Sequence, residues 1–245
     1  VALDATTGVR KWHYQLAHHD IWDYDTPMAP NLLDINVNGQ VRKAVAQTTK
    51  QGWIYTFDRV TGEPIWPIVE RPVPRSDTPG EQVSPTQPFP TKPAGYNLQG
   101  ISENDLIDFT PELRQEALEI AKQFRLGPLF TPGVHSTNPE GLRGGVTCPG
   151  NDGGTNTQGG SAIDPESGIL YVESVRACTA RYLVPGTERD VPESPFTFGA
   201  TVTDWVTGGA GFGGPDGLPM FKPPYAQITA IDMNTGEHLW QIPNG

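Results

Sequence analysis

The stretch LAHHDIWDYD, from Leu16 to Asp25, holds the residue types that could carry chemistry. It places two histidines, three aspartates, a tryptophan and a tyrosine in ten residues, which is unusual for a surface loop. Three interpretations are open at this point: a metal site, an acid/base site, or a polar loop beside an aromatic core. Adjacent histidines on a strand, such as His18 and His19, point to opposite faces. They could bind one ion together with Asp20 only from a loop, so polar packing is the favoured interpretation of this pair.

The elements that position this stretch are expected to be short strands and turns. The 245 residues include 28 Gly and 25 Pro, which indicates frequent turns, few helices and an all-β fold. A net charge of −11 without a Lys/Arg cluster argues against nucleic acid as a partner. No apolar run approaches the ~20 residues that span a bilayer. The chain starts at Val1 with no initiator Met or signal peptide, and we expect this start to fall inside a repeat.

Four segments share one pattern: an apolar residue, Asp, two further residues, Ser or Thr followed by Gly, and an apolar or aromatic run. They are ALDATTGVRKW, TFDRVTGEPIW, AIDPESGILYV and AIDMNTGEHLW, at residues 2–12, 56–66, 162–172 and 230–240. The Asp can accept backbone N–H bonds within a turn, and the Gly supplies the positive φ that closes a hairpin. Three of the four segments end in Trp, which we expect to dock on a neighbouring hairpin.

Hairpin repeats of this kind predict a β-propeller built from blades of four antiparallel strands. We expect the end of one blade at 1–15, a blade at 30–68 with a hairpin turn at Asn38-Gly39, and another blade at 159–242. The chain then supplies about two and a half blades, fewer than the ~4–8 that close a ring. The alternative is a β-sandwich with the same turn chemistry.

Two insertions interrupt the repeat. The first covers 69–158. The Pro-rich stretch 67–100, which leads into it, should not form a sheet because fixed φ angles and missing N–H groups oppose one. The first insertion also holds the one clear helix, 110–125, with Thr110 as N-cap and a proline at the first helical position. The second insertion covers 179–224 and is rich in Gly, Pro and aromatic residues.

Several motifs follow one another along the chain: HHDIWDYDTPMAPNLLDI, TKQGWIYTFDRVTGEPIWPIVERPVP, SPTQPFP, GPLFTPG and GLPMFKPPYAQITAIDMNTGE. Their succession resembles the membrane glucose dehydrogenase branch of the pyrroloquinoline quinone (PQQ) dehydrogenases over essentially the whole chain. The resemblance implies that residues 1–245 are part of an eight-bladed propeller with PQQ on its axis and a divalent cation, usually Ca²⁺ or Mg²⁺. It also implies oxidation of a sugar or an alcohol in the periplasm, with electrons passed to ubiquinone or a cytochrome.

By this resemblance, Asp23 matches the catalytic base, and Lys50 matches the lysine that contacts the quinone oxygens. The residue types agree with that chemistry. Hydride transfer from an alcohol to a quinone needs a base for the hydroxyl proton, and a carboxylate next to Trp22 is expected in a drier setting than bulk water. A cation near the quinone oxygens, Lys50 or a metal, stabilises the negative charge that develops there. Asp20 and Asp25 remain alternative bases, and Lys50 remains an alternative surface residue in a turn.

Further contacts to the cofactor are less well specified. The loop PGNDGGTNTQGG, at 149–160, lies where relatives often have Asn-Trp before Gly-Gly, and it has Thr157-Gln158 in that place. Glu173, after the strand ILYV, is a candidate cation ligand. The family's main cation ligands and most of its PQQ cradle come from earlier blades. The candidate PQQ contacts within the loop are Asn151, Asn156 and Gln158.

Cys148 and Cys178 are expected to form a disulfide, because they flank a predicted hairpin of strands 160–164 and 169–174.

The alternative function is a non-catalytic propeller that serves as a scaffold for protein contacts. Such a scaffold has no need for an acid and a lysine on successive inner loops. The chain alone is expected to be inactive and to self-associate or bind the missing blades, since open sheet faces are apolar.

Overall fold

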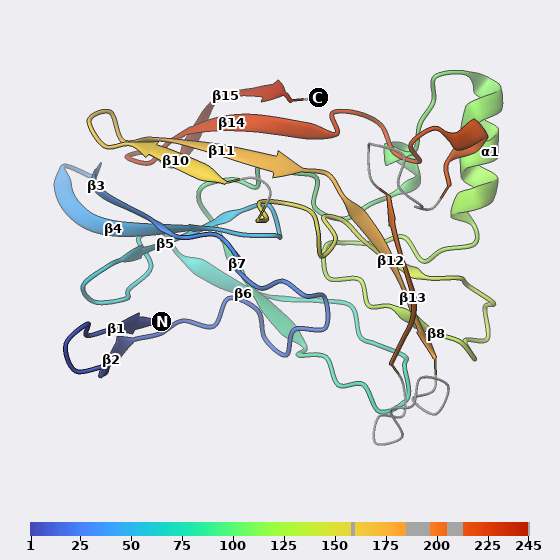
Figure 1. The fold of residues 1–245 in the computed structure, drawn as a ribbon, viewed down its shortest axis with the longest axis horizontal. Helices are drawn as coiled ribbons and strands as arrows, with labels where there is room; N and C mark the ends of the chain where they lie inside the picture. Colours follow the sequence, from blue (N-terminus) through green and yellow to red (C-terminus); the bar gives the residue numbers. More distant parts are fainter. Residues whose placement is uncertain (158–159, 185–196, 205–212, 245) are drawn as a thin grey trace.

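The computed structural model describes residues 1–157, 160–184, 197–204 and 213–244. Most of these residues form short strands in small, mainly antiparallel sheets, and the one described α-helix lies at an edge of the molecule (Figure 1). The predicted all-β fold is confirmed. None of the described helices is long and apolar enough to cross a membrane.

One sheet consists of β3 (Asn31–Val37), β4 (Gln40–Thr48) and β5 (Ile54–Asp58). The predicted turn at Asn38-Gly39 joins β3 to β4, and both turn residues have positive φ. Side chains alternate along β3, so that Leu33 and Ile35 are buried while their neighbours face solvent.

The fourth strand predicted for this blade is wrong, because the chain after β5 adds only an isolated bridge at Pro64. The N–H of Ile65 donates to the carbonyl of Thr56 at 2.9 Å. The same register would next place Pro67 opposite Ile54. Pro67 has no N–H to donate, so the ladder stops at this point.

The blade predicted at 159–242 does form a sheet of four antiparallel strands. β11 and β14 pair along their whole lengths, although the second insertion separates them in the sequence. The insertion therefore leaves the sheet after β11 and returns to it at β14. The strands of this sheet are β10 (Ser161–Asp164), β11 (Ile169–Val175), β14 (Ala226–Asp232) and β15 (Glu237–Pro243).

A further sheet, which the sequence did not predict, is built around the start of the second insertion (Figure 1). Its central strand β12 pairs antiparallel with β13 and β9 and parallel with β8. This sheet joins the insertion to the chain between residues 134 and 147. Its strands are β8 (Val134–His135), β9 (Gly145–Thr147), β12 (Cys178–Val184) and β13 (Thr197–Asp204).

The Pro-rich segment forms a two-stranded ribbon of β6 (Ile68–Pro72) and β7 (Thr86–Pro90), so the prediction that no sheet forms there is wrong. The reason is the position of the prolines. Pro72, Pro88 and Pro90 all occupy the same alternate set of cross-strand pairs. The ladder bonds belong to the other set, as the bonds just beyond the two ends of the ribbon show. At one end the N–H of Thr91 donates to the carbonyl of Pro67 at 3.0 Å, and at the other the N–H of Val73 donates to the carbonyl of Pro85 at 3.2 Å. The prolines therefore cost the ribbon no ladder bond.

The predicted helix is α1 (Pro111–Ala121), and the Thr110 hydroxyl accepts the N–H of Leu113 at 3.2 Å as an N-cap. It ends four residues before the predicted end at Arg125, because the Arg125 N–H instead donates to the carbonyl of Gly144 at 2.9 Å. Short 3₁₀ helices lie at Glu103–Asp105 and Pro215–Gly217. Helix α1 packs on a core that includes the buried Cys148–Cys178 pair, Met220 and Phe221.

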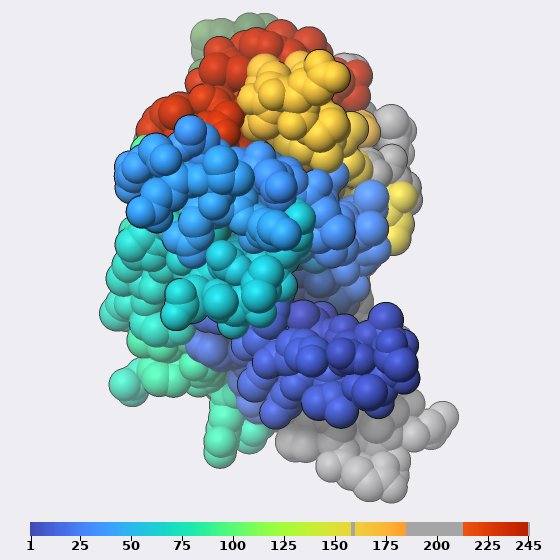
Figure 2. All heavy atoms as spheres, turned by 90° about the vertical axis from the view of Figure 1, so that its left-hand side faces the viewer, coloured from blue at the N-terminus to red at the C-terminus, as the bar shows by residue number. Residues whose placement is uncertain are grey.

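The repeated Asp turns form as predicted. In the hairpin of β1 (Ala2–Leu3) and β2 (Arg10–Trp12), the Asp4 carboxylate accepts the N–H groups of the two threonines that follow. Trp12 docks on the next Asp turn: its indole N–H donates to the carbonyl of Arg59 at 3.1 Å, and a Cβ on Gly62 would come within 2.6 Å of its ring. Figure 2 shows this hairpin below the sheet of β3 to β5.

Candidate active site

The loop that contains Asp23 is shaped by Asp20. The Asp20 carboxylate accepts the N–H of Trp22 at 2.8 Å and the N–H of Tyr24 at 2.6 Å. Asp23, between these two bonds, has a φ of 62°, in the left-handed region that non-Gly residues rarely adopt. Asp20 is therefore engaged in holding the loop, which argues against it as the alternative base.

Side chains on this loop alternate between the core and the surface. Trp22 is fully buried, and its indole N–H donates to the carbonyl of Thr131 at 3.0 Å. Tyr24 is buried as well and donates to the carbonyl of Pro149 at 2.6 Å, and this burial raises the pKa of its hydroxyl well above the usual value. The Asp23 side chain points the other way and is 59% exposed, so the drier setting expected beside Trp22 is wrong for the described residues.

Lys50 meets this loop from the turn between β4 and β5. Its side chain is only 7% exposed. The ammonium donates to the Asp23 carboxylate at 3.2 Å, to the Asp23 carbonyl at 3.0 Å, and to the Asp25 carboxylate. The alternative of an ordinary surface lysine is therefore wrong. An acid and a lysine predicted from distant motifs lie in direct contact.

The Gly-rich loop after Pro149 packs directly on the backbone of Lys50. A Cβ on Gly154, whose φ is 63°, would lie 2.0 Å from the Lys50 carbonyl oxygen, so only glycine fits there. Asn156 uses its amide within the loop, donating to the carbonyl of Asn151 at 3.3 Å. Gln158, the other predicted contact in this loop, lies outside the described residues.

Arg181 is the residue of this site that sequence reasoning missed. It lies on β12, is 4% exposed, and donates to the carbonyls of Ile21 and Trp22, directly before Asp23. Burial lowers the pKa of its guanidinium, although arginine stays protonated. An arginine inside the predicted second insertion carries no local signal that would assign it to this loop.

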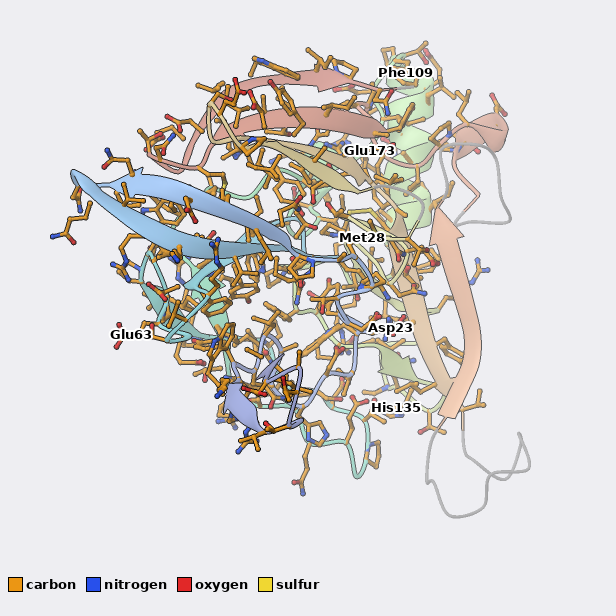
Figure 3. All side chains as sticks on the ribbon, turned by 60° about the vertical axis from the view of Figure 1, so that its left-hand side comes forward. Asp23, Met28, Glu63, Phe109, His135 and Glu173 are labelled. Atoms are coloured by element: carbon orange, nitrogen blue, oxygen red, sulfur yellow. A yellow bond between two sulfur atoms is a disulfide. The ribbon has the colours of Figure 1, made fainter. Side chains whose placement is uncertain are left out.

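The metal interpretation of the two histidines finds no support. His18 lies 2.9 Å from the Glu70 carboxylate, and His19 is exposed. Across the described ranges, no three or more His, Cys, Asp or Glu side chains group closely enough to hold a metal. Glu173, labelled on β11 in Figure 3 away from Asp23, accepts a bond from Asn244 at 3.2 Å.

A groove of about 940 Å³ borders the loop on one side. It runs from Asp20, Tyr24 and Asp25 to Trp12 and Phe57, between the β1–β2 hairpin and the sheet of β3 to β5. Its walls are mostly aromatic and aliphatic. Asp25, one of the two acids that Lys50 contacts, thus lines a concave, largely apolar surface.

Cys148 and Cys178 form the predicted disulfide, with a Cα separation of 4.4 Å. Both residues are fully buried. The bond joins β12, which carries Arg181, to the start of the Gly-rich loop, which packs on Lys50. It therefore links the segments that position Arg181 and Lys50.

Comparison with known proteins identifies the family. The family model "PQQ: Glucose/ethanol/alcohol dehydrogenase, beta-propeller domain" matches residues 1–245, and the chain belongs to this family. It is 35% identical to the quinate/shikimate dehydrogenase (quinone) of Acinetobacter baylyi over 100% of this chain and 31% of that protein. It is 31% identical to the quinoprotein glucose dehydrogenase of Escherichia coli over 98% of this chain and 30% of that protein. The chain thus spans less than a third of the length of these relatives.

Solved structures agree on the fold. A europium-containing methanol dehydrogenase superposes with a TM-score of 0.52 at 20% identity, over 98% of this chain and 32% of that one. The quinohemoprotein alcohol dehydrogenase from Comamonas testosteroni gives a TM-score of 0.50 at 18% identity, over 99% of this chain and 28% of that one. With the family match, these likenesses confirm the propeller class. The number of blades and the blade boundaries stay predictions.

Proposed function

We propose that this chain supplies the acid/base part of the active site of a PQQ-dependent dehydrogenase, which oxidises a hydroxyl group of a sugar or an alcohol. The observation that carries the proposal is the contact of Lys50 with Asp23 and Asp25. A scaffold propeller has no use for a nearly buried lysine held between two half-exposed carboxylates.

The chemistry of these side chains fits the cofactor. PQQ presents quinone and carboxylate oxygens, which accept hydrogen bonds. Lys50 offers a charged donor, and a bond from it to the cofactor would replace one of the three that its ammonium makes to Asp23 and Asp25. When bound, PQQ supplies a quinone that takes up the hydride and its two electrons. Asp23 would accept the proton of the substrate hydroxyl, and Lys50 would stabilise negative charge on the quinone oxygen. Asn156 and Gln158 are proposed as further contacts to the cofactor.

The substrate class follows from the relatives. Their names specify quinate or shikimate, glucose and glycerol, all of which carry several hydroxyl groups. We therefore expect a polyhydroxylated substrate. The divalent cation is proposed to be Ca²⁺ or Mg²⁺. A periplasmic location and transfer of electrons to ubiquinone or a cytochrome belong to the same proposal.

The test is reconstitution of the full-length gene product with PQQ and Ca²⁺ or Mg²⁺. The expected results are saturable binding in a PQQ absorbance titration, and reduction of a redox dye with at least one of glucose, quinate, glycerol and ethanol. A protein that binds no PQQ and reduces no dye would contradict the proposal and favour a scaffold.

A further inference from the structure

Arg181 holds the backbone immediately before Asp23. Its two terminal nitrogens donate separately to the carbonyls of Ile21 and Trp22, across 160 and 159 residues of sequence. Burying a guanidinium is costly unless its charge and donors are used. Here it binds two successive peptide carbonyls, which defines the orientation of both peptide planes.

Two other charged side chains hold the same short stretch. Asp20 accepts the N–H groups of Trp22 and Tyr24, at 2.8 and 2.6 Å. Lys50 donates to the carbonyl of Asp23 at 3.0 Å. Backbone groups on both sides of Asp23 are therefore fixed by side chains from three different segments. These contacts hold Asp23 at a left-handed φ, which residues other than glycine seldom adopt.

We propose that Arg181 is a positioning residue for the reaction: by holding the Ile21 and Trp22 carbonyls, it sets the direction in which the Asp23 carboxylate points. This inference rests on the proposed role of Asp23 as the base. It adds a requirement that the second insertion, through β12, takes part in forming the active site.

Arg181 also acts on Asp23 through its charge. The ionisable groups that interact with the Arg181 guanidinium include Asp20, Asp23, Tyr24 and Glu81. A positive charge attracts the Asp23 carboxylate directly. Loss of Arg181 should therefore release this carboxylate as well as the two carbonyls, and a guanidinium ion supplied from solution should restore both contacts in part, which it would not do for a simple loosening of the fold.

The experiment compares Arg181→Ala with Arg176→Ala in the full-length protein reconstituted with PQQ. Arg176 is a matched control, because its guanidinium also donates to a backbone carbonyl, that of Lys222 at 2.6 Å, away from the Asp23 loop. Misplacing a catalytic group by about 1 Å costs roughly 100-fold in rate, and we expect a loss of that order in kcat for Arg181→Ala only. Free guanidinium ion, at concentrations that do not denature, should restore part of it.

A second readout requires neither PQQ nor turnover. Amide hydrogen exchange at Trp22 and Tyr24 should be faster in Arg181→Ala than in the wild type, and unchanged in Arg176→Ala.

If Arg181→Ala does not fold, Arg181→Lys serves instead and should give an intermediate exchange rate and an intermediate kcat. If the wild type shows no turnover, the proposed function fails, and the exchange rates still decide whether Arg181 positions the loop. Wild-type exchange at both amides, or a loss of kcat equal in both alanine variants and not relieved by guanidinium, would overturn the inference.

Discussion

The Lys50 ammonium lies 3.2 Å from the carboxylate of Asp23 and bonds to Asp25 at the same time. Two carboxylates two residues apart would repel each other without it. Because the lysine side chain is nearly buried and the acids are half exposed, the positive charge is fixed while the acids remain reachable. This is the arrangement expected of a base beside a site of developing negative charge.

Removal of Lys50 should therefore affect both folding and cofactor binding. Lys50→Ala removes the three hydrogen bonds made by a nearly buried ammonium, and we expect a loss of about 1–3 kcal/mol in the free energy of unfolding. PQQ affinity should fall as well. Lys122→Ala, which breaks an exposed pair with Glu119, is the control and should change stability by less than about 1 kcal/mol. Urea unfolding and a PQQ titration measure the two effects; unchanged PQQ affinity in Lys50→Ala would contradict the assignment.

The disulfide should contribute strongly to stability. Its two cysteines are separated by 30 residues, and a closed loop of this length restricts the unfolded chain by about 3–4 kcal/mol. Replacing both Cys148 and Cys178 by Ala should lower the urea midpoint accordingly. Titration of free thiols in the denatured, unreduced protein should find none. Two reactive thiols would show that the bond does not form.

The ion pair of Asp77 and Arg125 makes a pH-dependent contribution to stability. The hydrogen bond from Arg125 holds the pKa of Asp77 below its usual value of 3.8. A lowered folded-state pKa stabilises the fold above the unfolded value and loses this effect as pH falls through the folded value. The Tm of Asp77→Asn should thus lie below that of the wild type at pH 7, and the two should converge below about pH 4. A difference in Tm that stayed constant down to pH 3 would refute this prediction.

The alternation of prolines in the β6–β7 ribbon predicts where a new proline is tolerated. Val69 occupies the set of pairs that carries the ladder bonds, so Val69→Pro removes one bond and should cost about 1 kcal/mol or more. Val69→Ala keeps the N–H and isolates the loss of the side chain. Pro72→Ala lies in the other set, at an exposed position, and should change stability by less than about 1 kcal/mol. Equal losses for Val69→Pro and Val69→Ala, measured by urea unfolding, would contradict the assigned ladder.

Much of the fold could be predicted from the sequence because the information was local. Each Asp turn carries its own acceptor and its own glycine, and the four-stranded unit ending at residue 243 follows from two such turns. The Pro-rich ribbon could not be predicted, since whether a proline costs a bond depends on the register of its partner strand. The sheet of β3 to β5 lacks a fourth strand for a similar reason, because the register places Pro67 at a position that would have to donate a ladder bond.

The residues of the candidate site also divide into those that the sequence could predict and those that it could not. Asp23 and Lys50 could be found because each lies within a motif that resembles a known family. Arg181 could not, because its role depends on two carbonyls about 160 residues earlier in the chain and on a sheet that forms only in the folded protein. The exposure of the Asp23 carboxylate was also missed, since the burial of Trp22 says nothing about the next side chain on an alternating loop.

The central claim is that Asp23 is the base, and the most direct test is the turnover of Asp23→Asn in the full-length protein reconstituted with PQQ. The substitution keeps the shape of the side chain and removes its ability to accept a proton. We predict that dye reduction with the best substrate is abolished while the PQQ titration remains that of the wild type. Turnover near the wild-type rate in Asp23→Asn would contradict the account, and Asp25→Asn would then be the next variant to measure.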